Sequence, residues 1–417
     1  MKRLKSMATD AKPNLTLKVR FPEFVGQTTH EVLLQEVTAE CKIQNPGQLS
    51  AESIMGVTKT DGLVPTDERL IGSDISRYKL LKKNWFAYNP MRLDIGSIAR
   101  WKNNRDALVS PDYIVFRCRD EPSAAIDPEF LDHFRRSEQW EDFVSESGLG
   151  SVRVRIYYKD IARLRLNLPQ ISEQRKIAEC LSALEGLIEA ESRKLDALSI
   201  HKRGLMQQVF PCEGETLPHL RLPEFQNAPK WSEMKLGDIV DIRSGNSPSQ
   251  YRLSTKGRNA FVKVDDLNNC TKYQVEARER SDDTNGIIPR GSVIFPKRGA
   301  AIDLNKIRLN VFPLLLDTNV MALTPGHQCT PEFLYYYLSS VGLSQIADSS
   351  TIPQINNKHI IPFKIALPET AEQERIATSL SSLDELIAAQ SDKFETLKSH
   401  RKGLMQQIFP PPPEVRT

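Results

Sequence analysis

The longest regular pattern of apolar positions lies in two segments of the chain, Ile177–Phe210 and Ile376–Phe409. In both segments apolar side chains recur every three or four residues, the spacing of a helix that pairs through a coiled-coil seam. A proline lies just before and just after each segment: Pro169, Pro211, Pro368 and Pro410. Because proline disrupts a helix interior, we expect each helix to be confined between its two prolines.

The seam residues that we expect to pair are Ile177, Leu181, Leu184, Ile188, Glu191, Leu198, Ile376, Leu380, Leu383, Ile387, Gln390 and Leu397. The first helix leads from one globular region into a second, and the second helix leaves that second region. If the two helices pair with each other, they must therefore run antiparallel. This pairing would bring together Glu191 and Gln390, the polar positions at the midpoints. A single polar layer in an apolar seam fixes register at some cost in stability.

The two helices belong to an internal repeat. Residues 168–211 align with residues 367–410 at a constant offset of 199, without gaps, and 23 of these 44 positions are identical. A weaker echo relates Val19–Phe24 to Leu220–Phe225, whereas the stretches between show little similarity. Duplication therefore kept the helices alike and let the globular regions diverge, as expected if the helices share one task and the globular regions serve two.

We expect the following four regions: a first globular domain at 1–155, a helical region with linker at 156–220, a second globular domain at 221–355, and a second helical region with tail at 356–417. The fold class expected for the domains is α/β or α+β, with a small sheet covered by helices. The predicted strands and helices are Tyr113–Cys118, Ser292–Pro296, Asn319–Leu323, Pro128–Arg136 and Pro331–Ser340. The predicted molecule is pseudo-twofold, with the domains at opposite ends of a rod about 55 Å long.

Composition excludes several classes of protein. The net charge of +3 and the pI of about 8.4 permit nucleic-acid binding without arguing for it. No apolar run reaches the roughly 20 residues of a membrane span, and the basic N-terminus lacks the apolar stretch of a signal peptide, so we expect a cytoplasmic protein. The six cysteines form no CxxC pair, so we expect neither a metal site nor a disulfide framework.

Motifs of catalysis are missing from the sequence. It has no GxxxxGK[ST] phosphate loop, no HExxH pair, and no Asn/Asp-Pro-Pro-Tyr/Phe segment of the kind found in DNA amino-methyltransferases. We therefore expect no catalytic residue and no cofactor bound by this chain. Scattered carboxylate pairs such as Asp265-Asp266 are more typical of turns than of metal sites.

Residues that could contact a nucleic acid combine cations for phosphates with amide or guanidinium groups for bases. In the first domain the densest set is Lys82, Lys83, Tyr88, Asn89, Arg92, Arg100, Lys102 and Arg105. In the second domain the set is Arg243, Asn246, Gln250, Tyr251, Arg252, Lys297, Arg298, Gln354, Asn357 and Lys358. For any one of these residues, a solvated loop position remains an alternative reading.

The helix motif EQxxIAxxLSxLxxLI, followed by HKRGLMQQVFP or HRKGLMQQIFP, resembles the specificity subunits of type I restriction–modification systems. The segments Phe86–Ser97 and Ile288–Ala300 are similar to segments of that family's recognition domains. The second domain closes with Ser350–Ile355, also family-like. The first domain departs from this pattern, because Arg155 stands where the second has Gln354.

The resemblance implies a non-catalytic subunit that reads a split, asymmetric site in double-stranded DNA, each domain reading one half. Its implied partners are two copies of a DNA methyltransferase subunit, which would use S-adenosylmethionine, and motor-nuclease subunits, which would use ATP and Mg. A spacing of about 55 Å corresponds to roughly 16 base pairs. Two alternatives stay open: a restriction–methylation fusion enzyme, and a stand-alone DNA-binding regulator or structural coiled-coil protein.

Overall fold

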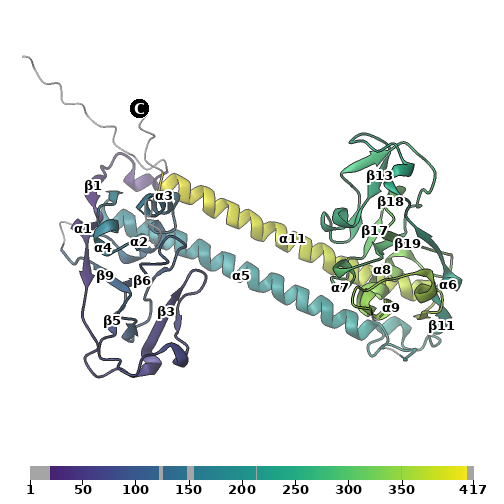
Figure 1. Cartoon of the computed structure of the whole chain (residues 1–417), viewed down its shortest axis with the longest axis horizontal. Coiled ribbons are helices and arrows are strands. Elements are labelled where there is room, and N and C mark those ends of the chain that lie inside the picture. The colour runs from purple at the N-terminus through teal and green to yellow at the C-terminus, as the bar shows by residue number, and fades with distance from the viewer. Residues whose placement is uncertain (1–18, 122–124, 148–154, 213, 349, 411–417) are drawn as a thin grey trace, which may run out of the picture. The chain divides into compact units, whose positions relative to one another are not determined.

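The computed structural model in Figure 1 describes residues 19–121, 125–147, 155–212, 214–348 and 350–410. The basic N-terminal segment, residues 151–154 of the first closing loop and most of the proline-rich tail lie outside the described residues. The chain forms two compact units. Unit 1 contains residues 1–191 and 393–417, and unit 2 contains residues 192–392. Each unit therefore combines one globular domain with part of both long helices. Because this division cuts through both helices, it does not test the four regions expected from the sequence, which stay a prediction.

The domain of unit 1 is built on two small sheets and a two-stranded ribbon. Its strands are β1 His30–Leu33, β2 Thr38–Cys41, β3 Ile54–Thr58, β4 Gly62–Pro65, β5 Lys79–Leu81, β6 Phe86–Tyr88, β7 Ile98–Arg100, β8 Ala107–Val109, β9 Ile114–Cys118 and β10 Arg165–Leu168. Its short helices are α1 Leu34–Val37, α2 Pro128–Phe134, α3 Glu138–Ser147 and α4 Tyr158–Ile161. One sheet has the order β2-β9-β6-β7, the other β4-β3-β8-β5, and β1 pairs with β10.

Unit 2 contains the corresponding elements. Its strands are β11 Ser232–Lys235, β12 Val240–Ser244, β13 Asn259–Val262, β14 Tyr273–Gln274, β15 Glu279–Ser281, β16 Val293–Pro296, β17 Arg308–Asn310, β18 Leu314–Leu316, β19 Val320–Pro325 and β20 Lys364–Leu367. Its short helices are α6 Leu236–Ile239, α7 Ala300–Asp303, α8 Pro331–Val341, α9 Leu343–Ile346 and α10 Asn357–Ile360. The sheets have the orders β12-β19-β16-β17-β14 and β15-β13-β18, and β11 pairs with β20.

The two domains share one topology although their sequences differ. The order β2-β9-β6-β7 in unit 1 corresponds to β12-β19-β16-β17 in unit 2. In each domain the second sheet contains a parallel pair, β3 with β8 and β13 with β18. The duplication therefore extends through the domain frameworks, which the divergent sequences between the repeated helices did not reveal.

The two long helices, α5 (Ile171–Val209) and α11 (Thr370–Ile408), each begin two residues after a proline and end two residues before the next. They run antiparallel. In unit 1 the N-terminal part of α5 (Ile177, Leu181) shares one core with the C-terminal part of α11 (Met405, Ile408). In unit 2 the C-terminal residue of α5, Val209, shares a core with the N-terminal part of α11.

A buried ion pair connects the start of each domain to the start of a long helix. Arg20 forms this pair with Glu173 in unit 1, and Arg221 pairs with Glu372 in unit 2 at 2.7 Å. Both carboxylates are buried. Because a buried carboxylate is costly without a cation, each pair requires its domain entrance to lie against its helix.

The neighbouring glutamine of each helix makes a second repeated connection. Gln174 accepts a hydrogen bond from the Asp127 backbone N–H, and Gln373 accepts one from Thr330, each at 2.9 Å. Both donors belong to the N-cap residues of the helices that cover the sheets, α2 and α8. The repeated sequence at the helix starts therefore includes the residues that attach each domain.

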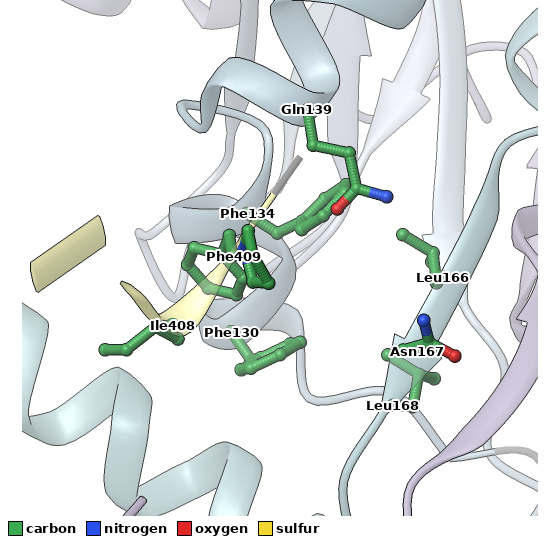
Figure 2. Close-up of a pocket in the computed structure, with 9 residues that line it drawn as sticks. Phe130, Phe134, Gln139, Leu166, Asn167, Leu168, Ile408 and Phe409 are labelled. Atoms are coloured by element: carbon green, nitrogen blue, oxygen red, sulfur yellow. The ribbon is translucent and has the colours of Figure 1, made fainter. Parts of the chain in front are cut away.

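The C-terminal end of α11 completes the core of unit 1. Figure 2 shows Phe409 beside Phe130 and Phe134, in an apolar pocket whose cavity measures about 20 Å³. The ring centroid of Phe409 lies 5.3 Å from that of Phe130 and 5.4 Å from that of Phe134, and both ring pairs are edge-on. In unit 2 the end of α5 does the same, because Phe210 packs edge-on against Phe333 and Tyr337.

Burial along the predicted seam changes with position. The seam residues nearest the domains are buried: Ile177, Leu181, Ile376 and Leu380. Those further along the helices are half-buried: Leu184, Ile188, Leu198, Leu383, Ile387 and Leu397. Glu191 and Gln390 are buried, and Glu191 pairs with Lys393 in unit 1. The contact between Glu191 and Gln390 stays a prediction, since these residues belong to different units.

Candidate nucleic-acid interface

Three predicted loops of the second domain meet at one edge of its larger sheet. Strands β12 and β16 both run antiparallel to β19, so their C-terminal ends reach the same edge. There the Lys297 ammonium donates to the Ser244 hydroxyl at 3.1 Å. Arg298 forms an isolated bridge with Gln354, and the Ile355 N–H donates to the Lys297 carbonyl at 2.9 Å. We name Ser244, Lys297, Arg298 and Gln354 the domain 2 loop cluster.

Two glycines shape this edge. A Cβ atom on Gly245 would lie 2.1 Å from the Asp317 carbonyl oxygen, so only glycine allows the loop after β12 to pass this close to the β18–β19 turn. Gly299, with φ of +78°, occupies the left-handed region that glycine tolerates best. It turns the chain directly after Arg298 and leaves that side chain exposed.

The domain 2 loop cluster is positively charged. Among the described residues, no carboxylate lies within ion-pair distance of Lys297, Arg298 or the neighbouring Lys358. Partial burial and the adjacent Arg298 guanidinium hold the pKa of Lys297 below its usual value. The Asp348 carboxylate accepts a hydrogen bond from the Gln354 N–H at 3.0 Å but forms no ion pair with these cations. Cations without ion-pair partners favour a polyanion such as the DNA backbone. Asn357 and Lys358, at the start of α10, are exposed beside the cluster.

The first domain forms the same arrangement with other residues. Strands β2 and β6 both run antiparallel to β9, and the Ile156 N–H donates to the Pro90 carbonyl at 2.9 Å, as Ile355 does to Lys297. Pro90 and Met91 therefore take the places of Lys297 and Arg298. We name Asn89, Met91, Arg92 and Arg155 the domain 1 loop cluster; Met91, Arg92 and Arg155 are exposed, and Asn89 is half-buried.

Four predicted DNA contacts have structural roles instead. Tyr88 is fully buried in the unit 1 core, where burial raises the pKa of its hydroxyl. Tyr251 is buried against Phe261, and its hydroxyl accepts from the Asn246 amide at 2.8 Å. Arg100 is tied to Asn84, Glu129 and Asp132. We withdraw Tyr88, Tyr251, Asn246 and Arg100 from the candidate set, because these side chains already hold the domain framework together.

The remaining first-domain cations lie at the other end of β6. The Asn84 N–H donates to the Trp101 carbonyl, and the Trp101 N–H donates to the Trp85 carbonyl. These two hydrogen bonds join the turn before β6 to the turn after β7. Exposed on these two turns are Lys82, Lys83, Lys102 and Arg105. The predicted first-domain set is thus split between opposite ends of one strand. Of the remaining second-domain residues, Arg243 pairs with Asp241, whereas Gln250 and Arg252 are exposed near the Pro248–Gln250 turn.

Unit 1 also has a cleft of about 920 Å³ between the β3–β4 turn and the helices. Its lining mixes both signs of charge, since Lys59, Lys102 and Arg136 share it with Asp94, Glu185 and Glu189. A polyanion gains little from such a balanced surface, so the cleft is a weaker DNA candidate than the loop clusters.

Sequence reasoning missed part of both clusters. The contacts predicted from the sequence include neither Ser244 nor Met91, because neither residue type signals DNA binding by itself. Arg155 was compared with Gln354 but was not placed among the contacts. The repeat offset of 199 also relates Ile156 to Ile355. Extending this offset from the helices to the closing loops therefore locates the corresponding positions of the two clusters.

A sequence model described as the type I restriction modification DNA specificity domain matches residues 229–399, which include the second domain and most of α11. Residues 229–399 therefore carry this family's domain, and over most of its length the chain is similar to type I restriction–modification specificity subunits. As a specificity subunit it is the non-catalytic, DNA-recognising component of such a system. Its partners are accordingly DNA and the other subunits of the restriction–modification complex.

Relatives of this specificity subunit occur in Methanocaldococcus jannaschii. The type I restriction enzyme MjaVIII specificity subunit is 23% identical over 64% of this chain and 67% of its own length. The putative type I restriction enzyme MjaX specificity subunit is 21% identical over 82% of this chain and 81% of its own length. The crystal structure of a type I system S subunit from M. genitalium has the same fold, with a TM-score of 0.58 at 15% identity, over 95% of this chain and 99% of that one. Within the described ranges no helix has both the length and the apolar character of a membrane span.

Proposed function

We propose that this specificity subunit reads a bipartite, asymmetric site in double-stranded DNA, one half through the domain 1 loop cluster and the other through the domain 2 loop cluster. The observation that carries the proposal is that the two loop clusters occupy the same place in the two domain frameworks but consist of different side chains. Hydrogen bonds from Ile156 and Ile355 fix the two clusters in the same way. Two equal frameworks with unequal side chains suit two different half-sites.

The side chains of the domain 2 loop cluster suit both parts of DNA recognition. Arg298 can donate two hydrogen bonds to guanine, and the Gln354 amide can both donate and accept at adenine. Lys297 suits a phosphate contact, because its ammonium is a point charge without directional preference. In the domain 1 loop cluster Met91 replaces Arg298 and Arg155 replaces Gln354, so the preferred bases should differ.

The proposed partners are two methyltransferase subunits, which would supply S-adenosylmethionine chemistry, and motor-nuclease subunits, which would supply the use of ATP and Mg. Support for two equal docking sites comes from Leu187 and Leu386, which are related by the repeat offset. They are 44% and 45% exposed, and each lies outside the predicted seam of its helix. A surface that occurs twice can hold two copies of one partner. Because its DNA target lies in the cell interior, we place the complex in the cytoplasm.

The decisive experiment is methylation-site sequencing with the full chain and its methyltransferase partner. Gln354→Ala should relax one position in one half-site by about 10-fold to 100-fold, which corresponds to about 1–3 kcal/mol per base contact. Arg155→Ala should affect only the other half. Lys83→Ala, which removes an exposed cation at the opposite end of β6, is the matched control and should leave the sequence preference unchanged.

Three results would contradict the proposal. The first is a change of both half-sites by Gln354→Ala alone. The second is an altered sequence preference in Lys83→Ala, which would move recognition to the opposite end of β6. The third is a site without two halves. Binding to promoter DNA with no methyltransferase partner would instead favour a stand-alone regulator.

A further inference from the structure

The segment that connects α5 to the second domain forms a loop closed upon itself. The Leu220 N–H donates to the Gln208 carbonyl at 2.8 Å, so the loop returns to the helix from which it started. Inside the loop the Glu215 N–H donates to the Cys212 carbonyl at 3.0 Å, and Gly214 has a φ of +81° that glycine adopts without strain. This folding brings Cys212, Glu215 and His219 to one side.

The potential ligand atoms of these three residues lie within 4.8 Å of one another. Cys212 Sγ is 3.6 Å from His219 Nε2, and His219 Nε2 is 3.7 Å from the Glu215 carboxylate. Zinc binds sulfur at about 2.3 Å and nitrogen at about 2.0–2.1 Å, and two such bonds at the tetrahedral angle separate the ligand atoms by about 3.6 Å. The sulfur–nitrogen distance therefore already equals that of a shared metal.

We propose that Cys212, Glu215 and His219 bind one zinc-class divalent cation, with water in the fourth position. A thiolate, an imidazole and a carboxylate select zinc over magnesium or calcium, which prefer oxygen ligands. The thiolate and the carboxylate together balance the charge of the cation. The carbonyl end of α5, at Val209, lies three residues before Cys212 and adds favourable negative potential.

The site would cross-link the entrance to the second domain. The repeat offset of 199 places Pro411 where the linker has Cys212, so the thiolate ligand is not repeated. The inference is independent of DNA recognition and goes against the expectation from the sequence that the chain holds no metal. That expectation was based on CxxC and HExxH patterns, and the spacing Cys-x2-Glu-x3-His fits neither of them.

Cobalt titration of the full chain under reducing conditions tests the site directly. Cobalt should bind in one equivalent per chain and produce the sulfur-to-cobalt charge-transfer absorption of a thiolate ligand, and added zinc should remove that absorption. Cys212→Ser should abolish the absorption. Cys180→Ser is the matched control, because Cys180 is the other exposed cysteine among the described residues, and it should change nothing.

Further variants and a second readout separate ligation from folding. Glu215→Gln and His219→Ala should weaken cobalt binding by about 10-fold or more while circular dichroism stays unchanged. Zinc should raise the thermal midpoint of the wild-type chain and of Cys180→Ser but not of Cys212→Ser, since a ligand of the native state stabilises it. The proposal is overturned if wild type gives no thiolate–cobalt absorption, if Cys212→Ser retains it, or if one cation is shared by two chains.

Discussion

Arg401, near the end of α11, donates a hydrogen bond to the Glu185 carboxylate of α5 within unit 1. The residues at the same repeat positions, Lys202 and Asp384, form the corresponding ion pair within unit 2. An offset of 199 turns Glu185 into Asp384 and Lys202 into Arg401. One ion pair is therefore used twice, with its acidic and basic partners exchanged between the helices. This exchange is what antiparallel pairing of two copies of one helix requires.

Charge reversal tests the pair in unit 1. Glu185→Arg places a third cation beside Arg401 and Arg136, so we expect unit 1 to lose about 1–3 kcal/mol of unfolding free energy. Adding Arg401→Glu should recover part of the loss, because the ion pair is then restored in reverse. Urea unfolding followed by tryptophan fluorescence in a Trp231→Phe background isolates unit 1, which holds the other three tryptophans.

The matched control for this reversal is Glu395→Lys, which breaks an exposed ion pair with Lys398 on α11. Exposed pairs contribute little, so we expect a change below about 1 kcal/mol. Equal effects of the two reversals, or no recovery in the double variant, would show that the pair between Glu185 and Arg401 is not a stabilising contact.

We expect His133 to make unit 1 sensitive to mild acid. Burial lowers the pKa of this imidazole, and the nearby Glu185 only partly opposes the effect. Arg136, Asp132 and Glu129 are the other charged groups around it. Because the folded-state pKa lies below the unfolded value of about 6.5, the unfolded chain binds the proton first. The contribution is therefore complete above about pH 6.5 and is lost as the pH falls toward the folded pKa.

His133→Gln should flatten the decline of the unfolding free energy between about pH 7 and pH 5. The carboxylates of Asp132 and Glu185, whose pKa values lie below their ordinary range despite burial because guanidinium groups surround them, lose their contributions only at lower pH. The reciprocal variant Tyr336→His should introduce a similar decline into unit 2, since Tyr336 occupies the corresponding position and bonds to Ser381 as His133 does to Ser182. A pH profile of His133→Gln identical to wild type would refute this assignment.

The helices were predictable because their periodicity, prolines and repeat all lie in the sequence. The Phe409 and Phe210 contacts were less accessible, since nothing local indicates that the end of one helix completes a core built by residues far away in the chain. Only some residues of the candidate interface could be predicted from the sequence. Cations and amides pointed to Lys297 and Gln354, but composition could not separate the buried Tyr88 and the paired Arg100 from their exposed neighbours. Burial and pairing are set by the tertiary fold, so identical residue types acquire different roles.

Phe409→Ala should destabilise unit 1 by about 3–5 kcal/mol, because it removes a ring buried between Phe130 and Phe134 and leaves a cavity. Phe210→Ala should act in the same way on unit 2. Limited proteolysis with mass-spectrometric identification of the cut sites shows which unit opens first in each variant. Cleavage in the same unit for both variants would contradict the separate cores, and Ile200→Ala, at a 66% exposed helix position, serves as the control.

Lys297→Gln should weaken DNA binding similarly for all sequences and reduce the slope of log K against log salt by about 1, because one phosphate contact is lost. Fluorescence anisotropy of the complete complex across a range of salt concentrations measures this slope. Lys83→Gln removes the same charge at the opposite end of the corresponding strand in the first domain and should leave the slope unchanged. An unchanged slope in Lys297→Gln would remove this residue from the phosphate contacts.

Glu191→Leu should raise the stability of the helix pair by about 1 kcal/mol, because leucine continues the apolar seam at a position now occupied by a buried carboxylate. The cost of leaving Lys393 without this partner is small, since the lysine side chain is 55% exposed and reaches water. Equilibrium urea unfolding of the full chain gives the change, and Glu191→Gln, which keeps a polar group of the same size, should show no gain. A loss of stability in Glu191→Leu would mean that the contacts of the carboxylate stabilise the helix pair more than the burial of leucine does.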